Sequence, residues 1–599
     1  MGEVKMLLRS ECRPEDTWNL ADIYPTVEDW EAAWNRIAEK CAGYDEFRGR
    51  LGESADMLYG CLAFDDSVCE ELDRLDSYAF QMLDQDTGNS EAQTLQQKAD
   101  DLRVKVRSAS SFIPVEILAV GEETVDRFME EDAKLAGYHR IFELIFRDKD
   151  HTLSAEAEHL LAEAGSVTEA SSNIYKMFNN ADLTFPPIEN ERGETVPVTH
   201  GTFISYLENP DIRVRRAAYE SVYKTYGAYR NTLATSFQAN IRQAMFYAKA
   251  RKYSSTRAYY LAGSNIPESV YDNLIETVHQ NLPSMYHYVA LRKKVLGLDQ
   301  LHLYDVYTPI VKDYEQKYTF EEAKALVKKG LAPMGGDYLN VLQEGFDNRW
   351  IDVYENKGKR SGAYSNGVYG VHPYVLLNFN YTLDNVSTLA HEMGHALHSY
   401  FSSASQPYCY ADYRIFVAEV ASTCNEALLN HYLMEHAEND QEKAYIINSY
   451  LDTFKGTLFR QTMFAEFEKI THQMLESGQS LTADKICSIY HDLNVRYFGP
   501  DMEVDELIDM EWARIPHFYR PFYVYQYATG FSAAIALSQK ILTEGAPAVE
   551  AYMSFLQGGG SKDPIDLLKM AGVDMNEKAP IMSAMKVFDD LVSRMEELL

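Results

Sequence analysis

Apolar residues recur at intervals of three and four positions through most of this sequence, and that spacing restricts its fold more than any other feature. The pattern holds from about residue 27 to 180, from about 209 to 340, and from 412 to the end. Such spacing places apolar side chains on one face of an α-helix, so these stretches predict series of amphipathic helices. At 599 residues the chain exceeds what one hydrophobic core usually supports. We therefore predict a mainly α protein with two or more lobes.

Two stretches interrupt the helical pattern. The first, LTFPPIENERGETVPVTHGTF at 183–203, has two short β-prone runs around an NERGE turn, and its three prolines exclude a central strand. We place a lobe boundary there, between an N-terminal helical lobe, 1–190, and a larger domain, 191–599. The second stretch, 349–381, is rich in Gly, Tyr, Val and Asn and predicts a small antiparallel sheet.

The charge and hydropathy of the chain exclude two classes of partner. Acidic residues outnumber basic ones by 90 to 56, which gives a formal net charge of −34, and no basic stripe stands out. A surface this negative repels phosphate backbones, so we expect no nucleic-acid partner. No apolar stretch approaches the roughly 20 residues needed to cross a bilayer, so we expect no membrane span.

The cysteines and the first residues indicate a compartment. The seven cysteines are widely spaced and form no C-x-x-C pair, which argues against a disulfide framework and against a thiolate zinc site. The opening MGEVKMLLRSECRPEDTW contains no apolar run of signal-peptide length. We therefore expect a cytoplasmic protein.

The segment LAHEMGHALHSY, 389–400, holds three histidines and a glutamate within eight positions. The helix that carries it should begin near Asp384 or Asn385, because both are good N-cap residues.

On that helix, His391 and His395 are four residues apart and therefore lie one turn, roughly 6 Å, apart on one face. This spacing lets two imidazoles reach one tetrahedral ion. Glu392 follows the first histidine and projects toward the position of a water or a substrate. H-E-x-x-H is the pattern of zinc hydrolases for this reason.

A catalytic zinc needs a third protein ligand and one free position. A third histidine six residues after the second is excluded, because that position is Phe401. His398 lies one turn further along the same face, a poor position for closing the tetrahedron, and suits a supporting or cleft-lining role. The predicted helix at 412–433 offers Glu419 and Glu426 on one face. One would bind zinc and the other would accept a hydrogen bond from a ligand histidine, and spacing does not decide which.

A peptide-cleaving site would also need donors for the oxyanion, and RIPHFYRPFYVYQYATGF, 514–531, is the obvious source. In a helix, Tyr519, Tyr523 and Tyr527 would share a face, with His517 at its start. The alternative is that these aromatic residues are core, and it competes most strongly for Tyr519 and Tyr525.

The segment GKRSGAYSNG, 358–367, suits an edge strand whose free backbone groups pair with an extended peptide through Gly362, Ala363 and Tyr364. An ordinary hairpin is the alternative.

Segments spread over nearly the whole chain resemble the oligoendopeptidase F family of thimet-oligopeptidase-like zinc metallopeptidases. They are TWNLADIYP, HTLSAEAEHLLA, KRSGAYS, LAHEMGHALHSYFS, FVAEVASTCNEALL, FRQTMFAEFE and IPHFYRPFYVYQYATG. The resemblance implies that Glu419 is the third zinc ligand and that Glu426 supports the site. VAST follows the ligand where the thimet branch has Pro-Ser, so the chain is more similar to the bacterial branch.

The same resemblance implies that His517 and tyrosines of its segment face the zinc and the substrate. The tyrosines do not align without ambiguity, because the glycine-rich loop of the thimet branch is missing, and we choose Tyr523 and Tyr527. The strand at 358–367 is implied to lie beside the bound peptide.

The resemblance further implies a two-lobed, zincin-like fold of the gluzincin type, with a deep channel and the small sheet at its floor. It implies one Zn²⁺ per chain, which activates water and polarises the scissile carbonyl, with Glu392 as general base. The substrates would be short unstructured peptides cut at internal bonds. Two other readings remain: a zinc carboxypeptidase of similar helical fold, and a non-catalytic peptide-binding protein. The oligomeric state is not predicted.

Overall fold

In the computed structural model, the described residues, 6–311 and 316–599, form two compact units. The first unit takes its residues from Met1–Asp150, Gln316–Leu429 and Leu537–Gly572. The second takes its residues from His151–Glu315, Asn430–Ala536 and Val573–Leu599. The lobe boundary at 183–203 stays a prediction of the sequence.

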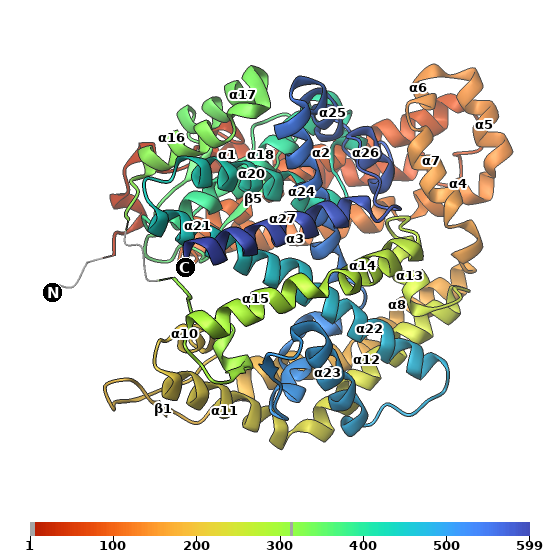
Figure 1. The fold of residues 1–599 in the computed structure, drawn as a ribbon. Coiled ribbons are helices and arrows are strands. Elements are labelled where there is room, and N and C mark those ends of the chain that lie inside the picture. Colours follow the sequence, from red (N-terminus) through yellow and green to blue (C-terminus); the bar gives the residue numbers. More distant parts are fainter. Residues whose placement is uncertain (1–5, 312–315) are drawn as a thin grey trace. The chain divides into compact units, whose positions relative to one another are not determined.

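Helices dominate both units, as predicted. Those of the first unit are α1 Val27–Lys40, α2 Ala55–Gln85, α3 Ser90–Ser110, α4 Phe112–Val120, α5 Glu122–Glu131, α6 Ala133–Ala136, α7 His139–Arg147, α16 Phe320–Gly330, α17 Gly335–Asp347, α18 Leu383–Ser405, α19 Tyr408–Ala411, α25 Ala546–Leu556 and α26 Pro564–Met570 (Figure 1). Two helices cross the division between the units, α20 Ile415–His436 and α24 Tyr525–Glu544.

The helices of the second unit are α8 Ala155–Thr168, α9 Ala170–Met177, α10 Phe203–Glu208, α11 Ile212–Ala228, α12 Arg230–Ala250, α13 Thr256–Ala262, α14 Glu268–Gln280, α15 Leu282–Val295, α21 Asp440–Phe454, α22 Arg460–Glu476, α23 Ala483–Phe498 and α27 Ala579–Leu598. Its strands are β1 Ile188–Glu189, β2 Thr195–Val196, β3 Leu301–His302 and β7 Met502–Glu503. β1 and β2 pair antiparallel around the NERGE turn, which confirms the short β-prone runs predicted at 183–203. Within the described residues, no helix is both long and apolar enough to span a membrane.

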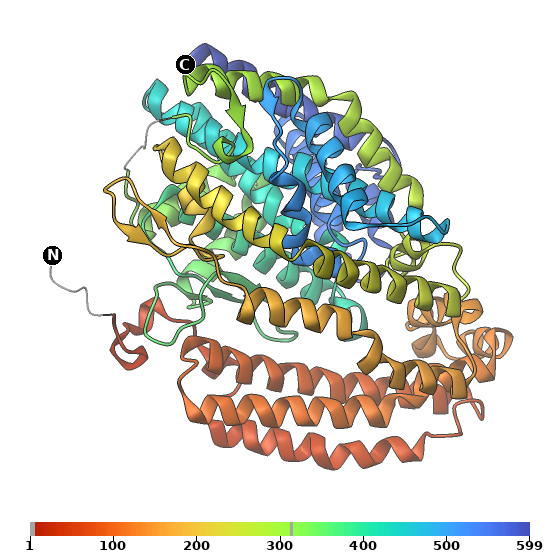
Figure 2. The ribbon, with the colours of Figure 1, turned by 90° about the horizontal axis from the view of Figure 1, so that it is seen from below.

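The long helices α1, α2 and α3 lie side by side at the start of the first unit (Figure 2). Trp30 is fully buried among them, and its indole nitrogen donates to the carbonyl oxygen of Leu75 at 2.8 Å. Burying an indole is favourable when its N–H keeps a partner, so this residue both fills the core and fixes the approach of α1 to α2.

The first unit also contains the predicted small sheet, with strands β4 Ile351–Asp352, β5 Tyr364–Asn366 and β6 Tyr374–Leu376 in the order β4-β6-β5. The sheet is mixed and not purely antiparallel as predicted. β5 and β6 pair antiparallel as a hairpin, but β4 pairs parallel with β6. The chain between β4 and β5 is long enough to cross to the far side of β6, which leaves β5 at an edge.

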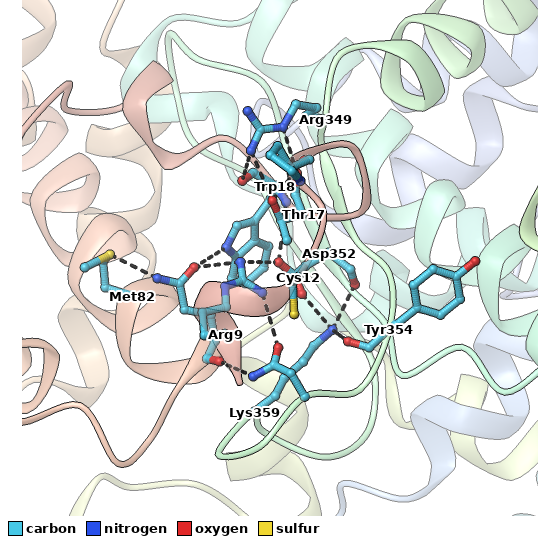
Figure 3. A network of polar contacts seen from close by, with 12 residues as sticks. Arg9, Cys12, Thr17, Trp18, Met82, Arg349, Asp352, Tyr354 and Lys359 are labelled. Carbon is cyan, nitrogen blue, oxygen red and sulfur yellow. Dashed lines mark hydrogen bonds and ion pairs between the residues drawn. The ribbon is translucent and has the colours of Figure 1, made fainter. Parts of the chain in front are cut away.

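A buried ion-pair network fixes β4 to the N-terminal segment (Figure 3). The Asp352 side chain is 1% exposed and contacts Arg9 at 2.5 Å and Lys359 at 2.7 Å. Arg349, just before β4, donates through Nε to the carbonyl oxygen of Thr17 at 3.0 Å. A buried carboxylate needs such partners, because without them it would lose its hydration and gain nothing in return. The network therefore holds both ends of the β4 region to residues 9–17.

Helices α18 and α20 approach each other more closely at Gly394 than side chains would allow. A Cβ atom placed on Gly394 would lie 2.5 Å from Ser422 Cα and 2.8 Å from the carbonyl oxygen of Ala421. Both obstacles are backbone atoms, so a side chain could be accommodated only by moving a helix. Glycine at this position therefore sets the distance between the two helices.

Gly394→Ala should lower the free energy of unfolding by about 1–3 kcal/mol, because the added methyl group overpacks the contact between α18 and α20. Chemical denaturation of the metal-free protein measures this directly. Gly336→Ala is the matched control, since nothing lies within 4 Å of a Cβ at that helical position and alanine favours a helix over glycine. Equal stability of Gly394→Ala and the wild type would contradict the close approach described above.

Candidate metal centre

The helix that carries the H-E-x-x-H segment begins one or two residues earlier than predicted. α18 starts at Leu383, and its N-cap is Thr382, whose hydroxyl accepts a hydrogen bond from the amide of Asn385 at 3.2 Å. Asp384 and Asn385 lie inside the first turn, so neither is the N-cap. Threonine can cap a helix as asparagine and aspartate do, and these three residue types all occur within positions 382–385.

Three ligand-type side chains converge between α18 and α20. His391, His395 and Glu419 each present one atom within 4.8 Å of the others. One Glu419 carboxylate oxygen lies 3.4 Å from His391 Nε2 and 3.5 Å from His395 Nε2. The two imidazole rings have centroids 4.9 Å apart and stand nearly perpendicular, so their Nε2 atoms reach a common point from different directions.

These distances fit a tetrahedral ion. Ligand atoms bound at about 2.1 Å to such an ion lie about 3.4 Å from one another. The two measured distances to Glu419, 3.4 and 3.5 Å, match that edge. Two imidazole nitrogens and one carboxylate oxygen are also a donor set that zinc accepts, and three protein ligands leave one position free. The residues present therefore fit a catalytic zinc ion.

Glu426 lies behind the first histidine. Its carboxylate oxygen is 2.5 Å from His391 Nδ1, the distance of a strong hydrogen bond in which the imidazole donates to the carboxylate. A proton held on Nδ1 leaves the Nε2 lone pair free for a metal. Glu419 is thus the carboxylate that converges with both imidazoles, and Glu426 contacts only the other nitrogen of His391. The roles of ligand for Glu419 and of support for Glu426, which the resemblance implies, stay predictions.

The charges of this cluster call for a cation. Burial lowers the pKa of His391, but hydrogen bonds to Glu419 and Glu426 outweigh it and hold the pKa well above its usual value. Burial raises the pKa of Glu419, yet its contacts with His391 and His395 hold the pKa below its usual range. Two carboxylates around two imidazoles are thus stable only with added positive charge, either as protons or as a metal ion.

Glu392 is buried next to the cluster and is not one of the three converging residues. Its residue surface is 6% exposed, and burial raises the pKa of its carboxyl group. A raised pKa suits a group that takes up a proton and gives it back, because it brings the carboxylate closer to the working pH.

His398 lies outside the cluster and is packed like a core residue. It is 1% exposed and its ring stacks on Tyr413 with centroids 3.7 Å apart. Burial lowers its pKa to about 3, so the imidazole is neutral. Its supporting role stays a prediction.

The predicted peptide-pairing strand is β5, and it lies at an edge of its sheet. Gly362 and Ala363 precede it and line a cavity with Thr388 of α18, whereas Gly367 at its end lies against Ser399. The strand therefore runs along α18 over the stretch that holds His391 and His395. The side chain of Tyr364 packs toward Trp18, with ring centroids 6.3 Å apart, so only its backbone is available at the edge.

The prediction of a shared face required the segment 514–531 to form one helix, and the segment does not. A short 3₁₀ turn spans Pro516–Tyr519, the chain then bends through Phe522, which has φ +54°, and α24 begins at Tyr525. Pro521 explains the break, because proline disfavours a helical conformation in the residue before it.

Despite the break, His517, Tyr523 and Tyr527 come together. The ring centroids are 6.3 Å apart for His517 and Tyr523, and 5.4 Å apart for the two tyrosines. Tyr519 instead stacks on Tyr175 at 4.1 Å, and Tyr525 is 3% exposed and 5.0 Å from Tyr271. Tyr525 is therefore buried in the core, whereas Tyr519 is half-buried in an aromatic stack. Tyr525 and Tyr527 lie at the start of α24, the helix that has residues in both units. His517, Tyr519 and Tyr523 precede that helix.

Sequence reasoning missed two residues that support the centre. The Ser422 hydroxyl donates to the Glu419 carboxylate at 3.2 Å, and its position three residues later on the same helix could have indicated this. Asn425 is fully buried, donates to the carbonyl oxygen of Ala390 in α18 at 3.1 Å, and accepts from the Tyr338 hydroxyl at 2.8 Å. Those contacts join three helices and leave no local signal in the sequence.

Comparison with known families gives two matches. Residues 205–587 match the model of peptidase family M3, and residues 116–185 match a model described as oligopeptidase F. The first match covers more than half of the chain.

Individual relatives agree with these matches. The chain is 49% identical to oligopeptidase PepF of Bacillus subtilis over 591 residues, which cover 99% of this chain and 88% of that protein. It is 39% identical to an oligoendopeptidase F homolog of Lactococcus lactis over 98% of both chains.

Solved structures are similar throughout their length. A putative peptidase from Chlamydophila abortus has a TM-score of 0.94 and 35% identity, over 99% of this chain and 100% of that one. Oligoendopeptidase-F from Enterococcus faecium has a TM-score of 0.75 and 38% identity, over 95% of this chain and 99% of that one. With its H-E-x-x-H helix, a matched family model and relatives that cover its whole length, this chain belongs to the oligoendopeptidase F proteins of peptidase family M3 and is a metallopeptidase.

Proposed function

We propose that this chain is a zinc-dependent oligoendopeptidase that hydrolyses internal bonds of short unstructured peptides and binds one zinc ion. The observation that carries the proposal is the convergence of His391 Nε2 and His395 Nε2 on one carboxylate oxygen of Glu419, at 3.4 and 3.5 Å. A zinc ion in such a site supplies Lewis-acid chemistry, which polarises a carbonyl and acidifies water. We also expect the protein to act in the cytoplasm.

Glu392 is the proposed general base. It lies next to a ligand in sequence, stays out of the ligand cluster, and is buried with a raised pKa. In this role its carboxylate takes the proton of the attacking water and later delivers it to the departing amine nitrogen. A buried carboxylate with few competing partners can make both transfers without exchange with bulk solvent.

The peptide backbone is proposed to bind along the free edge of β5. Support comes from the edge position of that strand and from its course along α18 past the two histidines. A peptide paired with this edge would be held extended, with its side chains on alternate faces. Folded proteins cannot present an extended strand easily, which agrees with a preference for unstructured peptides.

His517 and one or both of Tyr523 and Tyr527 are proposed to stabilise the oxyanion. Their side chains form one cluster of a ring nitrogen and two phenol groups, which are suitable hydrogen-bond donors. Burial lowers the pKa of His517, with Arg520 adding to the effect. A neutral imidazole can still donate through one of its two nitrogens.

Substitution of the three acidic residues tests the assignment of roles. Glu392→Gln should keep the metal but lower kcat by about 10²- to 10⁴-fold, because only proton transfer is lost. Glu419→Ala should lose metal affinity, because it removes one of three ligands. Glu426→Gln should weaken metal binding or activity by about 10- to 100-fold and still bind the ion. Metal analysis after dialysis and peptide-cleavage rates measure both properties. If Glu426→Ala strips the ion and Glu419→Ala does not, the ligand assignment is wrong.

Substitution of the aromatic cluster tests the oxyanion donors. His517→Ala, and Tyr523→Phe or Tyr527→Phe where that tyrosine donates, should lower kcat by about 10²- to 10³-fold with metal content unchanged. Tyr525→Phe is the matched control, since its ring is buried against Tyr271, and its rate should stay at the wild-type value. Wild-type kcat in all three cluster variants would remove these residues from the mechanism.

An internally quenched peptide blocked at both ends separates an endopeptidase from a carboxypeptidase. An endopeptidase needs no free terminus, so the zinc-loaded enzyme should cleave the blocked peptide and yield fragments cut at internal bonds. Mass spectrometry of the products gives the bond. If the enzyme leaves the blocked peptide intact and releases single residues from the carboxyl end of unblocked peptides, the carboxypeptidase would be favoured.

A further inference from the structure

A cavity of about 340 Å³ lies beside the metal centre in the first unit and has no role in the proposed reaction. Gly362 and Ala363, which lead into the edge strand, form one side. Asp384 and Thr388, in the first two turns of α18, form another, and the aromatic ring of Phe379 closes a third. The cavity is thus built from the proposed peptide-binding strand and the ligand-bearing helix.

The position of the cavity relative to the ligands follows from helix geometry. Thr388 comes three residues before His391 and four before Glu392, and therefore lies on their face of α18. Asp384 lies one further turn away, about 10 Å from His391 along the axis. A residue of an extended peptide advances about 3.3 Å. A peptide on the β5 edge would therefore pass Asp384 about three residues from the bond that is cut.

The lining has the chemistry of a subsite for a long basic side chain. Of the described residues that line the cavity, Asp384 alone carries a charge. Within the described part of the chain, no hydrogen bond or ion pair is recorded for its carboxylate. Leu377 and Phe379 also line the cavity, but they are almost fully buried and add only a small apolar surface for an aliphatic stem. Thr388 and Asn378 add polar groups to the lining. Lysine and arginine side chains combine such a stem with a cationic end.

The surroundings also favour a cation electrostatically. Asp384 is an exposed residue, but partial desolvation of its carboxyl group raises its pKa, and the negative charge of Glu426 raises the pKa further. A positive group placed beside Asp384 would relieve both effects. The whole chain, with a net charge of −34, attracts basic peptides more than acidic ones.

A simpler role for Asp384 is local. An acidic residue in the first turn stabilises a helix through the helix dipole, and Asp337 occupies the corresponding region of α17. That role predicts an effect on stability and none on the choice of peptide. The two roles can therefore be separated by substrate preference.

We propose that the cavity beside Asp384 is a specificity subsite that binds a lysine or arginine side chain two to four residues from the scissile bond. This proposal rests on the proposed endopeptidase function and names a class of substrate for it.

A set of blocked, internally quenched peptides tests the proposal on the zinc-loaded, full-length protein. Each peptide carries a single lysine, at a different position before or after the cut. A matched peptide carries norleucine at the same position, which has a similar aliphatic stem without the charge. The wild type should show a higher kcat/KM for lysine than for norleucine at one position, by about fivefold or more for a partly enclosed ion pair. Asp384→Asn should bring that ratio close to one, and Asp384→Lys should favour glutamate at the same position.

Asp337→Asn is the control, because it removes a first-turn carboxylate from a neighbouring helix and should leave the lysine-to-norleucine ratio at the wild-type value. Thermal unfolding of each variant shows that it is folded. A wild type without preference for lysine at any position, or a preference that survives in Asp384→Asn, overturns the subsite while leaving the endopeptidase in place. Failure of the wild type to cleave any peptide of the set would instead remove the proposed function, and the subsite with it.

Discussion

The contact between α18 and α20 at Gly394 is the constraint on which the metal centre depends. A tetrahedral site tolerates errors of only a few tenths of an ångström, and its ligands here come from two helices. The backbone of Ser422 occupies the space that a Cβ of Gly394 would need, at 2.5 Å, so the helices cannot approach more closely or carry a larger residue there. Asn425 adds a buried hydrogen bond from α20 to the Ala390 carbonyl. Together these contacts fix both the separation of the helices and their register.

Because Glu419 and Glu426 are both on α20, the register of α20 against α18 determines the positions of both carboxylates. Glu419 and Glu426 are seven residues apart, two turns on one face, and they meet His391 at its two different nitrogens. In the proposed site, the inner carboxylate would bind the metal, and the outer one would hold the imidazole in the tautomer that a metal requires. The shifted pKa values of His391 and Glu419 have the same origin, the close contact of imidazoles and carboxylates within a half-buried group of four side chains.

The sequence was most informative where function depends on short-range periodicity. Two histidines four residues apart share a helix face, and two glutamates seven apart share another, so the sequence alone predicts which side chains form this cluster. Spacing did not decide between Glu419 and Glu426, because that depends on how two helices pack. The family resemblance supplied the missing choice.

Predictions failed where a local pattern had more than one solution. The start of α18 was predicted at Asp384 or Asn385, but Thr382, only two positions before Asp384, is the N-cap. The tyrosines of 514–531 have helical spacing, but Pro521 and the positive φ of Phe522 break the segment. The sheet was predicted antiparallel from the composition of 349–381, and the parallel pairing of β4 depends on a crossover that composition does not reveal. The contacts of Asn425 and the cavity beside Asp384 involve segments that are distant in the sequence, so local patterns did not predict them.

The ion-pair network around Asp352 connects the three-stranded sheet to Arg9, more than 300 positions earlier in the sequence. Arg9 supplies one of the two cations that neutralise this buried carboxylate, and Asp352 belongs to the strand next but one to the β5 edge. Removing one member of a buried ion pair costs about 3–5 kcal/mol. Proteolytic trimming or a recombinant tag that displaces Arg9 would therefore loosen the sheet that ends in the β5 edge, although neither alters a residue of the His391, His395 and Glu419 cluster.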